Sequence, residues 1–281
     1  MRKLVRTIPV AVVAALVLTA SASPARAAVT IGETFTPVNP CFDRTRLQTT
    51  SPGSQYKVPS TGGITAWTVT SWSFEAGPTP PSIKLKIGRS AGPDRFTIIG
   101  ESGLMTPGAN RLNTFPVQIP VRAGDIIGNY TPPPIQNCGR NLPAGSGFQQ
   151  HFLVGEVALG GTETFNIQDD FQSDLSAVLV PSNAFTLGPT TRNKKKGIAF
   201  ITATVPNPGA LAVSGKGLKR VAKTASGPGD VKLKIKAKGQ KEQKLNETGK
   251  VKVTPTISYT PTGGDLSTQS RKLKLKKNLG G

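Results

Sequence analysis

The chain has 281 residues, with 31 glycines, 24 prolines, 36% hydrophobic residues and a formal net charge of +20. This length corresponds to about two domains, and the hydrophobic content provides for one or two modest cores. Its two cysteines do not form a CxxC pair, which argues against a redox motif or a zinc site.

The positive charge is divided unevenly along the chain. Residues 1–27 hold 4 Lys/Arg and no acidic residue, and residues 28–191 hold 10 Lys/Arg against 11 Asp/Glu. Residues 192–281 hold 21 Lys/Arg against 4 Asp/Glu, a net charge of +17. A nearly neutral half therefore precedes a strongly basic half.

The first 27 residues have the pattern of a secretory signal peptide. A basic start, MRKLVR, precedes IPVAVVAALVLTA, an apolar run of 13 residues that is too short to span a bilayer as a helix. Ala25-Arg26-Ala27 then gives a small-x-small cleavage site. The alternative is an uncleaved anchor. We expect cleavage, a secreted or extracellular protein with no transmembrane segment in its mature form, and cell-wall association as a further possibility.

Residues 28–181 are predicted to form a jelly-roll-like β-sandwich. Short segments rich in β-branched and aromatic residues alternate with Gly/Pro turns, and no long amphipathic helical pattern competes with them. The predicted strands cover residues 63–74, 82–89, 95–102, 114–120, 125–130 and 175–180.

Both cysteines, Cys41 and Cys138, lie in this half. Export places them in an oxidising compartment, so we expect a disulfide between them. Two free thiols are the alternative.

Aromatic side chains in this half raise the question of glycan binding. Trp67, Tyr130 and His151 are candidate glycan contacts, although large aromatics more commonly pack in the core of a small sandwich. Trp72 has the opposite parity to Trp67 and is predicted to lie in the core.

The acidic residues give no catalytic or metal pattern. The spacing of Asp169, Asp170 and Asp174 does not match a calcium loop, so a solvated acidic turn is expected. Glu156 and Glu163 would need to lie close together to act as an acid/base pair. No nucleophile, phosphate-loop, metal or cofactor motif is present, which favours a non-enzymatic protein without a cofactor.

Residues 182–281 are predicted to form a basic immunoglobulin-like β-sandwich of about seven strands, estimated from its segment rhythm. Apolar and lysine residues alternate over Val231–Lys238, and again in 250–253 and 272–277. This period-two pattern is typical of strands with one buried and one wet face. Pro255 removes a ladder donor, so its strand is expected to be broken or at an edge.

Several segments of the basic half are similar to a C-terminal module of uncharacterised secreted actinobacterial proteins. They are NKKKGIAFITATVPNPGALAVSGKGLKRV, VKLKIKAK, LNETGKVKV and ISYTPTGG. In that family the module often follows a jelly-roll-like domain, which WSFEAG, FTIIGES and VRAGDIIG of this chain resemble. The resemblance implies a fold and an extracellular compartment, and it implies no activity or functional residue.

The lysines of these strands have two interpretations. They keep a β-protein soluble and block edge pairing, or they form a face for an anionic cell-wall polymer. Specific nucleic-acid binding is disfavoured, because this half has few arginines and few aromatics. The polyanion-binding candidates are Lys232, Lys234, Lys236, Lys238, Lys250, Lys252, Lys272 and Lys274.

Two functional hypotheses follow. The first is a secreted, non-enzymatic, cell-envelope-associated binding or scaffold protein whose basic half holds anionic surface polymers. The alternative is a glycan-binding or glycan-hydrolysing jelly-roll protein.

Overall fold

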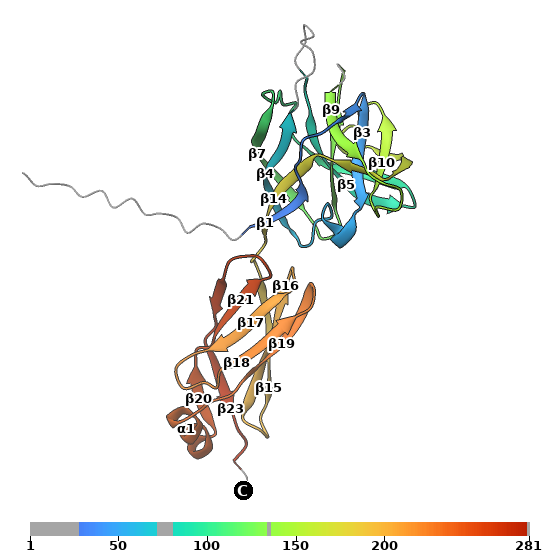
Figure 1. Cartoon of the computed structure of the whole chain (residues 1–281). Coiled ribbons are helices and arrows are strands. Elements are labelled where there is room, and N and C mark those ends of the chain that lie inside the picture. The colour runs from blue at the N-terminus through green and yellow to red at the C-terminus, as the bar shows by residue number, and fades with distance from the viewer. Residues whose placement is uncertain (1–27, 72–80, 134–135, 280–281) are drawn as a thin grey trace, which may run out of the picture.

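The computed structural model describes residues 28–71, 81–133 and 136–279. The predicted signal peptide and Trp72 lie outside these ranges. Almost every regular element is a strand, which confirms the all-β sandwich prediction (Figure 1). Each sheet in the described ranges takes its strands from one side of residue 182 only. Among these residues no helix has the length and apolar character needed to cross a membrane.

The N-terminal half begins with a four-stranded antiparallel sheet in the order β1-β14-β4-β7. Its strands are β1 (Val29–Glu33), β14 (Leu175–Pro181), β4 (Gly62–Ser71) and β7 (Arg111–Val121). Strand β4 therefore contains the described part of the strand predicted from residue 63, and β7 and β14 contain two further predicted strands.

A seven-stranded sheet packs against the first, in the order β11-β6-β5-β8-β3-β10-β12. Its strands are β11 (Thr162–Thr164), β6 (Arg95–Glu101), β5 (Lys84–Gly92), β8 (Ile126–Thr131), β3 (Arg44–Thr50), β10 (Gln149–Val154) and β12 (Asn166–Asp169). A single turn of 3-10 helix, Pro52–Ser54, follows β3. Burial of alternate apolar residues from both sheets, such as Trp67, Ile87 and Leu175, forms the main core between them.

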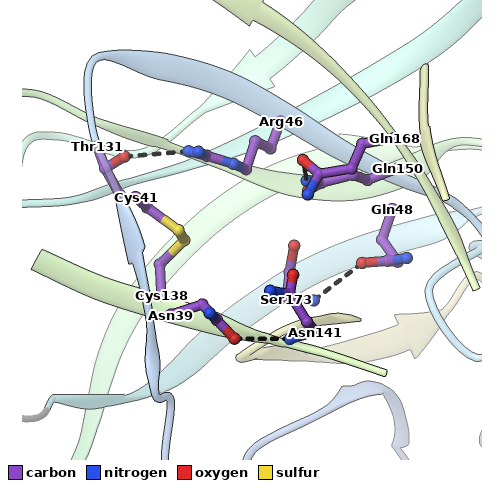
Figure 2. Close-up of a disulfide and its surroundings, with 10 residues drawn as sticks. All are labelled: Asn39, Cys41, Arg46, Gln48, Thr131, Cys138, Asn141, Gln150, Gln168 and Ser173. Carbon is purple, nitrogen blue, oxygen red and sulfur yellow. Dashed lines mark hydrogen bonds between the residues drawn. A yellow bond between two sulfur atoms is a disulfide. The ribbon is translucent and has the colours of Figure 1, made fainter. Parts of the chain in front are cut away.

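A small sheet in the order β13-β9-β2 holds the disulfide. Its strands are β13 (Phe171–Ser173), β9 (Gln136–Asn141) and β2 (Asn39–Cys41). Cys41 bonds to Cys138 with a Cα–Cα distance of 5.5 Å (Figure 2). Both cysteines pack against Phe171. The predicted disulfide is thereby confirmed.

The C-terminal half packs two main sheets around a single core. One has the order β15-β16-β19, and the other has the order β18-β17-β21-β22. Their strands are β15 (Thr186–Asn193), β16 (Ile198–Val205), β19 (Gly229–Ile235), β18 (Val221–Ala225), β17 (Gly209–Ser214), β21 (Thr256–Pro261) and β22 (Ser267–Ser270).

The predicted break at Pro255 is confirmed. It separates β20 (Lys250–Val253) from β21, and β23 (Leu273–Lys276) follows β22 after a similar gap. Because β20 pairs with β23 and β21 pairs with β22, the two pairs are successive parts of one interrupted hairpin. The estimate of about seven strands was too low, because these interruptions divide two long strands.

A helix, α1 (Gln240–Thr248), was not predicted. The segment is dominated by residues with good helix propensity, and it ends where Gly249 adopts a left-handed conformation with φ of 66°. Only Leu245 of the helix is buried, and it joins the core. The helix lies beside β20 at the end of the sandwich (Figure 1).

Candidate functional site

The antiparallel pair β20–β23 places lysines directly opposite one another. Lys250 faces Lys276, and Lys252 faces Lys274. The alternate residues of both strands, Val251, Val253, Leu273 and Leu275, are buried in the core, which turns the lysines outward. Like charges directly across a ladder destabilise the pair, so this arrangement is unfavourable in the free protein.

Three of these lysines, Lys250, Lys252 and Lys274, help to line two adjoining hollows of about 600 and 450 Å³. The two hollows share Lys241, Lys252 and Lys274. We call them together the lysine groove. No acidic residue lines either hollow in the described part of the chain. The groove lysines are Lys216, Lys241, Lys244, Lys250, Lys252, Lys272 and Lys274.

Helix α1 forms one wall of the groove. Lys241 and Lys244 are three residues apart on this helix, a spacing that places them on one helical face. The ammonium of Lys241 donates a hydrogen bond to the carbonyl of Lys252 at 3.2 Å, which holds it over β20. Along each strand, lysines two residues apart are separated by about 6.6–7 Å, less than the Debye length of about 8 Å at physiological salt. An anionic chain in the groove would therefore feel several charges at once.

The structure separates the predicted lysines into two sets. Lys250, Lys252, Lys272 and Lys274 line the groove, whereas Lys232, Lys234, Lys236 and Lys238 line neither of its hollows.

The second set belongs to β19 and the segment after it, in a different sheet. Lys232 lies over the ring of Phe200, 4.7 Å from its centroid, and Lys236 forms an ion pair with Glu242 at 3.6 Å. Part of the charge of this set is thus engaged within the protein.

Sequence patterns alone missed Lys216, Lys241 and Lys244. Lys216 lies in a turn. Lys241 and Lys244 lie on α1, and the sequence pattern does not predict a helix there. Recognition of the helix would have placed Lys241 and Lys244 on one face, but not beside β20.

The candidate glycan contacts do not form an open surface. Trp67 has no exposed area, and its ring packs against Phe115 with centroids 5.0 Å apart. The hydroxyl of buried Tyr130 donates to Asp43 at 3.1 Å. Buried His151 bonds Thr49 through Nδ1 at 2.8 Å and Asp94 through Nε2 at 2.9 Å. Trp67 therefore belongs to the core and offers no face to a sugar ring.

Glu156, one of the acidic residues singled out in the sequence, has structural partners. Glu156 accepts hydrogen bonds from Lys84 at 2.7 Å and Lys86 at 2.8 Å. Burial would raise the pKa of Glu156, but these two bonds outweigh it and hold the pKa below its usual value. A lowered pKa is the opposite of what a general acid needs.

The aspartates also act locally. Asp170 accepts hydrogen bonds from the backbone and hydroxyl of Ser146, at 2.9 and 2.7 Å, and so closes a turn. Asp174 is buried and accepts from two backbone N–H groups. Asp169 bonds Gln149 at 2.9 Å. In the described ranges no group of three His, Cys, Asp or Glu residues is arranged to hold a metal ion.

The comparisons with known proteins identify no family and no function for this chain. No family model matches the chain, and no curated protein matches it. Among solved structures, the crystal structure of beta-1,2-glucanase from Parabacteroides distasonis is similar at 10% identity with a TM-score of 0.19. The match covers 83% of this chain and 30% of that chain. A TM-score this low supports no conclusion about fold or activity.

Proposed function

We propose that this protein is a secreted, non-enzymatic binding protein whose lysine groove holds an anionic polymer of the cell envelope. The observation that carries the proposal is the register of β20 and β23, which sets Lys252 against Lys274 and Lys250 against Lys276. These pairs adjoin hollows lined by further lysines and by no acidic residue in the described chain. A polyanion bound there would replace lysine–lysine repulsion with attraction.

Solubility alone is the simpler explanation of surface lysines, and it explains the β19 set well. Scattered lysines keep a sheet soluble wherever they lie. Solubility alone does not account for lysines placed directly opposite one another. Pairing each lysine with an acidic residue across the ladder would keep the sheet equally soluble without the repulsion between like charges. The groove therefore favours a binding role over a purely protective one.

The proposed compartment is supported by the leader pattern and is compatible with the disulfide. In this proposal the N-terminal sandwich is a scaffold or binding module carried by the basic half. The glycan alternative loses its principal residue, because Trp67 is fully buried.

The test is retention on isolated anionic wall polymer over a salt titration, comparing two double variants of the full chain. Lys252→Gln/Lys274→Gln removes a facing pair of the groove. Lys232→Gln/Lys234→Gln removes the same charge from β19 and is the matched control. Screening predicts that salt releases the wild-type protein. We expect the groove variant to elute at clearly lower salt than the control variant.

Two results would contradict the proposal. Equal losses in both double variants would show that only total charge matters. Retention that does not weaken with salt would rule out electrostatic binding.

A further inference from the structure

Within the described residues, a buried guanidinium of the N-terminal half has no carboxylate partner. Arg46 on β3 is only 3% exposed, and no ion pair joins it to an acidic residue of the described chain. Its Nη1 donates to Thr131 Oγ1 at a long 3.4 Å, and its Nε has no hydrogen-bond partner among the described residues. Figure 2 shows the guanidinium directed toward Thr131, near the disulfide. Buried charges are normally paired or bound to an ion, because isolation from water is costly.

Unpartnered amides lie beside it. Asn129 on β8 is the direct cross-strand neighbour of Arg46, is fully buried, and has no partner for either amide atom in the described chain. Gln150 on β10 donates to Gln168 at 2.7 Å, but its own oxygen is unpartnered there. Among the described residues, Arg46 Nε and Asn129 Nδ2 are donors that lack an acceptor, and Asn129 Oδ1 and Gln150 Oε1 are acceptors that lack a donor.

A second arginine adds positive charge on the same face. Arg44 is two residues from Arg46 along β3, so both side chains point to the same side of the sheet. Arg44 is half-buried and lies over the ring of Phe152, 4.6 Å from its centroid. Burial, and then the nearby charge of Arg44, lower the pKa of Arg46 to about 10. Arg46 thus remains charged at neutral pH, and the face carries two positive charges.

We propose that Arg46, with Thr131 and Asn129 beside it and Arg44 at the rim, binds a small oxyanion such as a carboxylate or phosphate group. A guanidinium presents its N–H donors in a fork that matches two oxygens of either group. An oxyanion there would accept from Arg46 Nε and Asn129 Nδ2 and would neutralise a buried charge. The site is separate from the lysine groove and does not depend on the function proposed for it.

The test is thermal unfolding of the full chain with increasing acetate or phosphate at constant ionic strength. The expected wild-type result is a rise in Tm of about 3 °C or more near saturation. A response to acetate alone would identify a carboxylate site, and a response to phosphate alone would identify a phosphate site. Arg46→Met should abolish the rise. It should not lower Tm in buffer without these anions, because it removes an unpaired buried charge together with its cost.

One control locates the effect. Arg122→Met removes one exposed positive charge from the same half and should keep the full response. The proposal is overturned if neither anion raises the wild-type Tm, or if Arg46→Met responds as the wild type does.

A second measurement covers the case in which Arg46→Met does not fold. Crystals of the wild-type protein soaked in phosphate and in acetate would be compared at high resolution. Density for either anion within hydrogen-bonding distance of Arg46 Nε supports the proposal, and water alone at that position overturns it.

Discussion

Asn207 and Thr61 are joined by a reciprocal pair of hydrogen bonds. Asn207 Oδ1 accepts from the backbone N–H of Thr61 at 2.6 Å, and Asn207 Nδ2 donates back to the carbonyl of Thr61 at 2.9 Å. The same amide nitrogen donates to the carbonyl of Ser182 at 2.9 Å. Asn207 lies in the turn between β16 and β17 and is 1% exposed. Its side chain therefore acts as an added peptide group that ties the basic half to the N-terminal half.

Asn207→Ala is expected to loosen this junction. It removes three hydrogen bonds and leaves the half-buried N–H of Thr61 and carbonyl of Ser182 without these partners, at a cost of about 1–3 kcal/mol, whereas the carbonyl of Thr61 still accepts from the N–H of Ser182 at 2.9 Å. Small-angle scattering should show a wider range of shapes, and thermal unfolding should begin earlier. The control is Asn193→Ala, which removes an exposed hydrogen bond to Lys196. Identical scattering from Asn207→Ala and the wild type would contradict the prediction.

Loss of the disulfide should destabilise the N-terminal half strongly. The Cys41–Cys138 bond closes a loop with a sequence separation of 97. The chain-entropy model assigns such a loop about 4–5 kcal/mol. Cys41→Ala/Cys138→Ala should lower the calorimetric Tm of the N-terminal transition, and reducing agent should do the same to the wild type. A reductant effect of equal size in the double variant would show that the disulfide is not its cause.

Asp174 is expected to make stability depend on pH. Its carboxylate accepts from the N–H groups of Phe35 at 2.8 Å and Thr70 at 2.7 Å. Burial nevertheless raises its pKa from 3.8 to about 7. Between pH 4 and 7 the native state then binds more protons than the unfolded state, so the contribution of Asp174 to the free energy of unfolding falls as pH rises.

The measurement is chemical denaturation of the wild type and Asp174→Asn at several pH values. The difference in the free energy of unfolding between them should change by up to about 4 kcal/mol between pH 4 and 7 and level off above pH 7. Glu156, whose pKa is lowered, acts in the opposite direction and is common to both proteins. A difference that is constant over this range would contradict the assignment.

Lys274→Glu should move stability and binding in opposite directions. The new carboxylate would face Lys252 across the ladder and replace repulsion with attraction, which stabilises by about 0.2–1 kcal/mol. The same change places a negative charge in the lysine groove and should weaken retention on anionic polymer several-fold. Urea unfolding and the salt titration measure the two effects. Loss of both stability and retention would indicate damage to the fold instead.

The strands could be predicted from the sequence where a single residue pattern determined which face was buried. Apolar–lysine alternation over 250–253 and 272–277 could only bury one face, and β20 and β23 formed there. Pro255 predicted the break between β20 and β21, because proline has no N–H to donate to a strand ladder. Helix α1 was missed because its short segment buries only Leu245, so no apolar stripe marked it.

The candidate sites depend on relations that local patterns do not contain. The register that sets Lys252 against Lys274 is a choice between two distant strands, and a shift of two residues would have kept the same buried face. The unpaired state of Arg46 depends on which residues β8 and β10 bring to it. The sequence allowed Trp67 to be either a core residue or a glycan contact, because parity alone does not tell which side of a strand the second sheet covers.

The position of the lysine groove has a mechanical consequence. Tyr259, at one end of the interrupted hairpin, donates to the carbonyl of Asn207 at 2.8 Å, whereas Lys250 and Lys276 lie at the other end. Tension between a polymer held at the groove and the N-terminal half would run along β20 and β21. Their hydrogen bonds lie across that direction, so they would be loaded together in shear and not one after another. Under the proposed function, the basic half would therefore act as a spacer that resists extension.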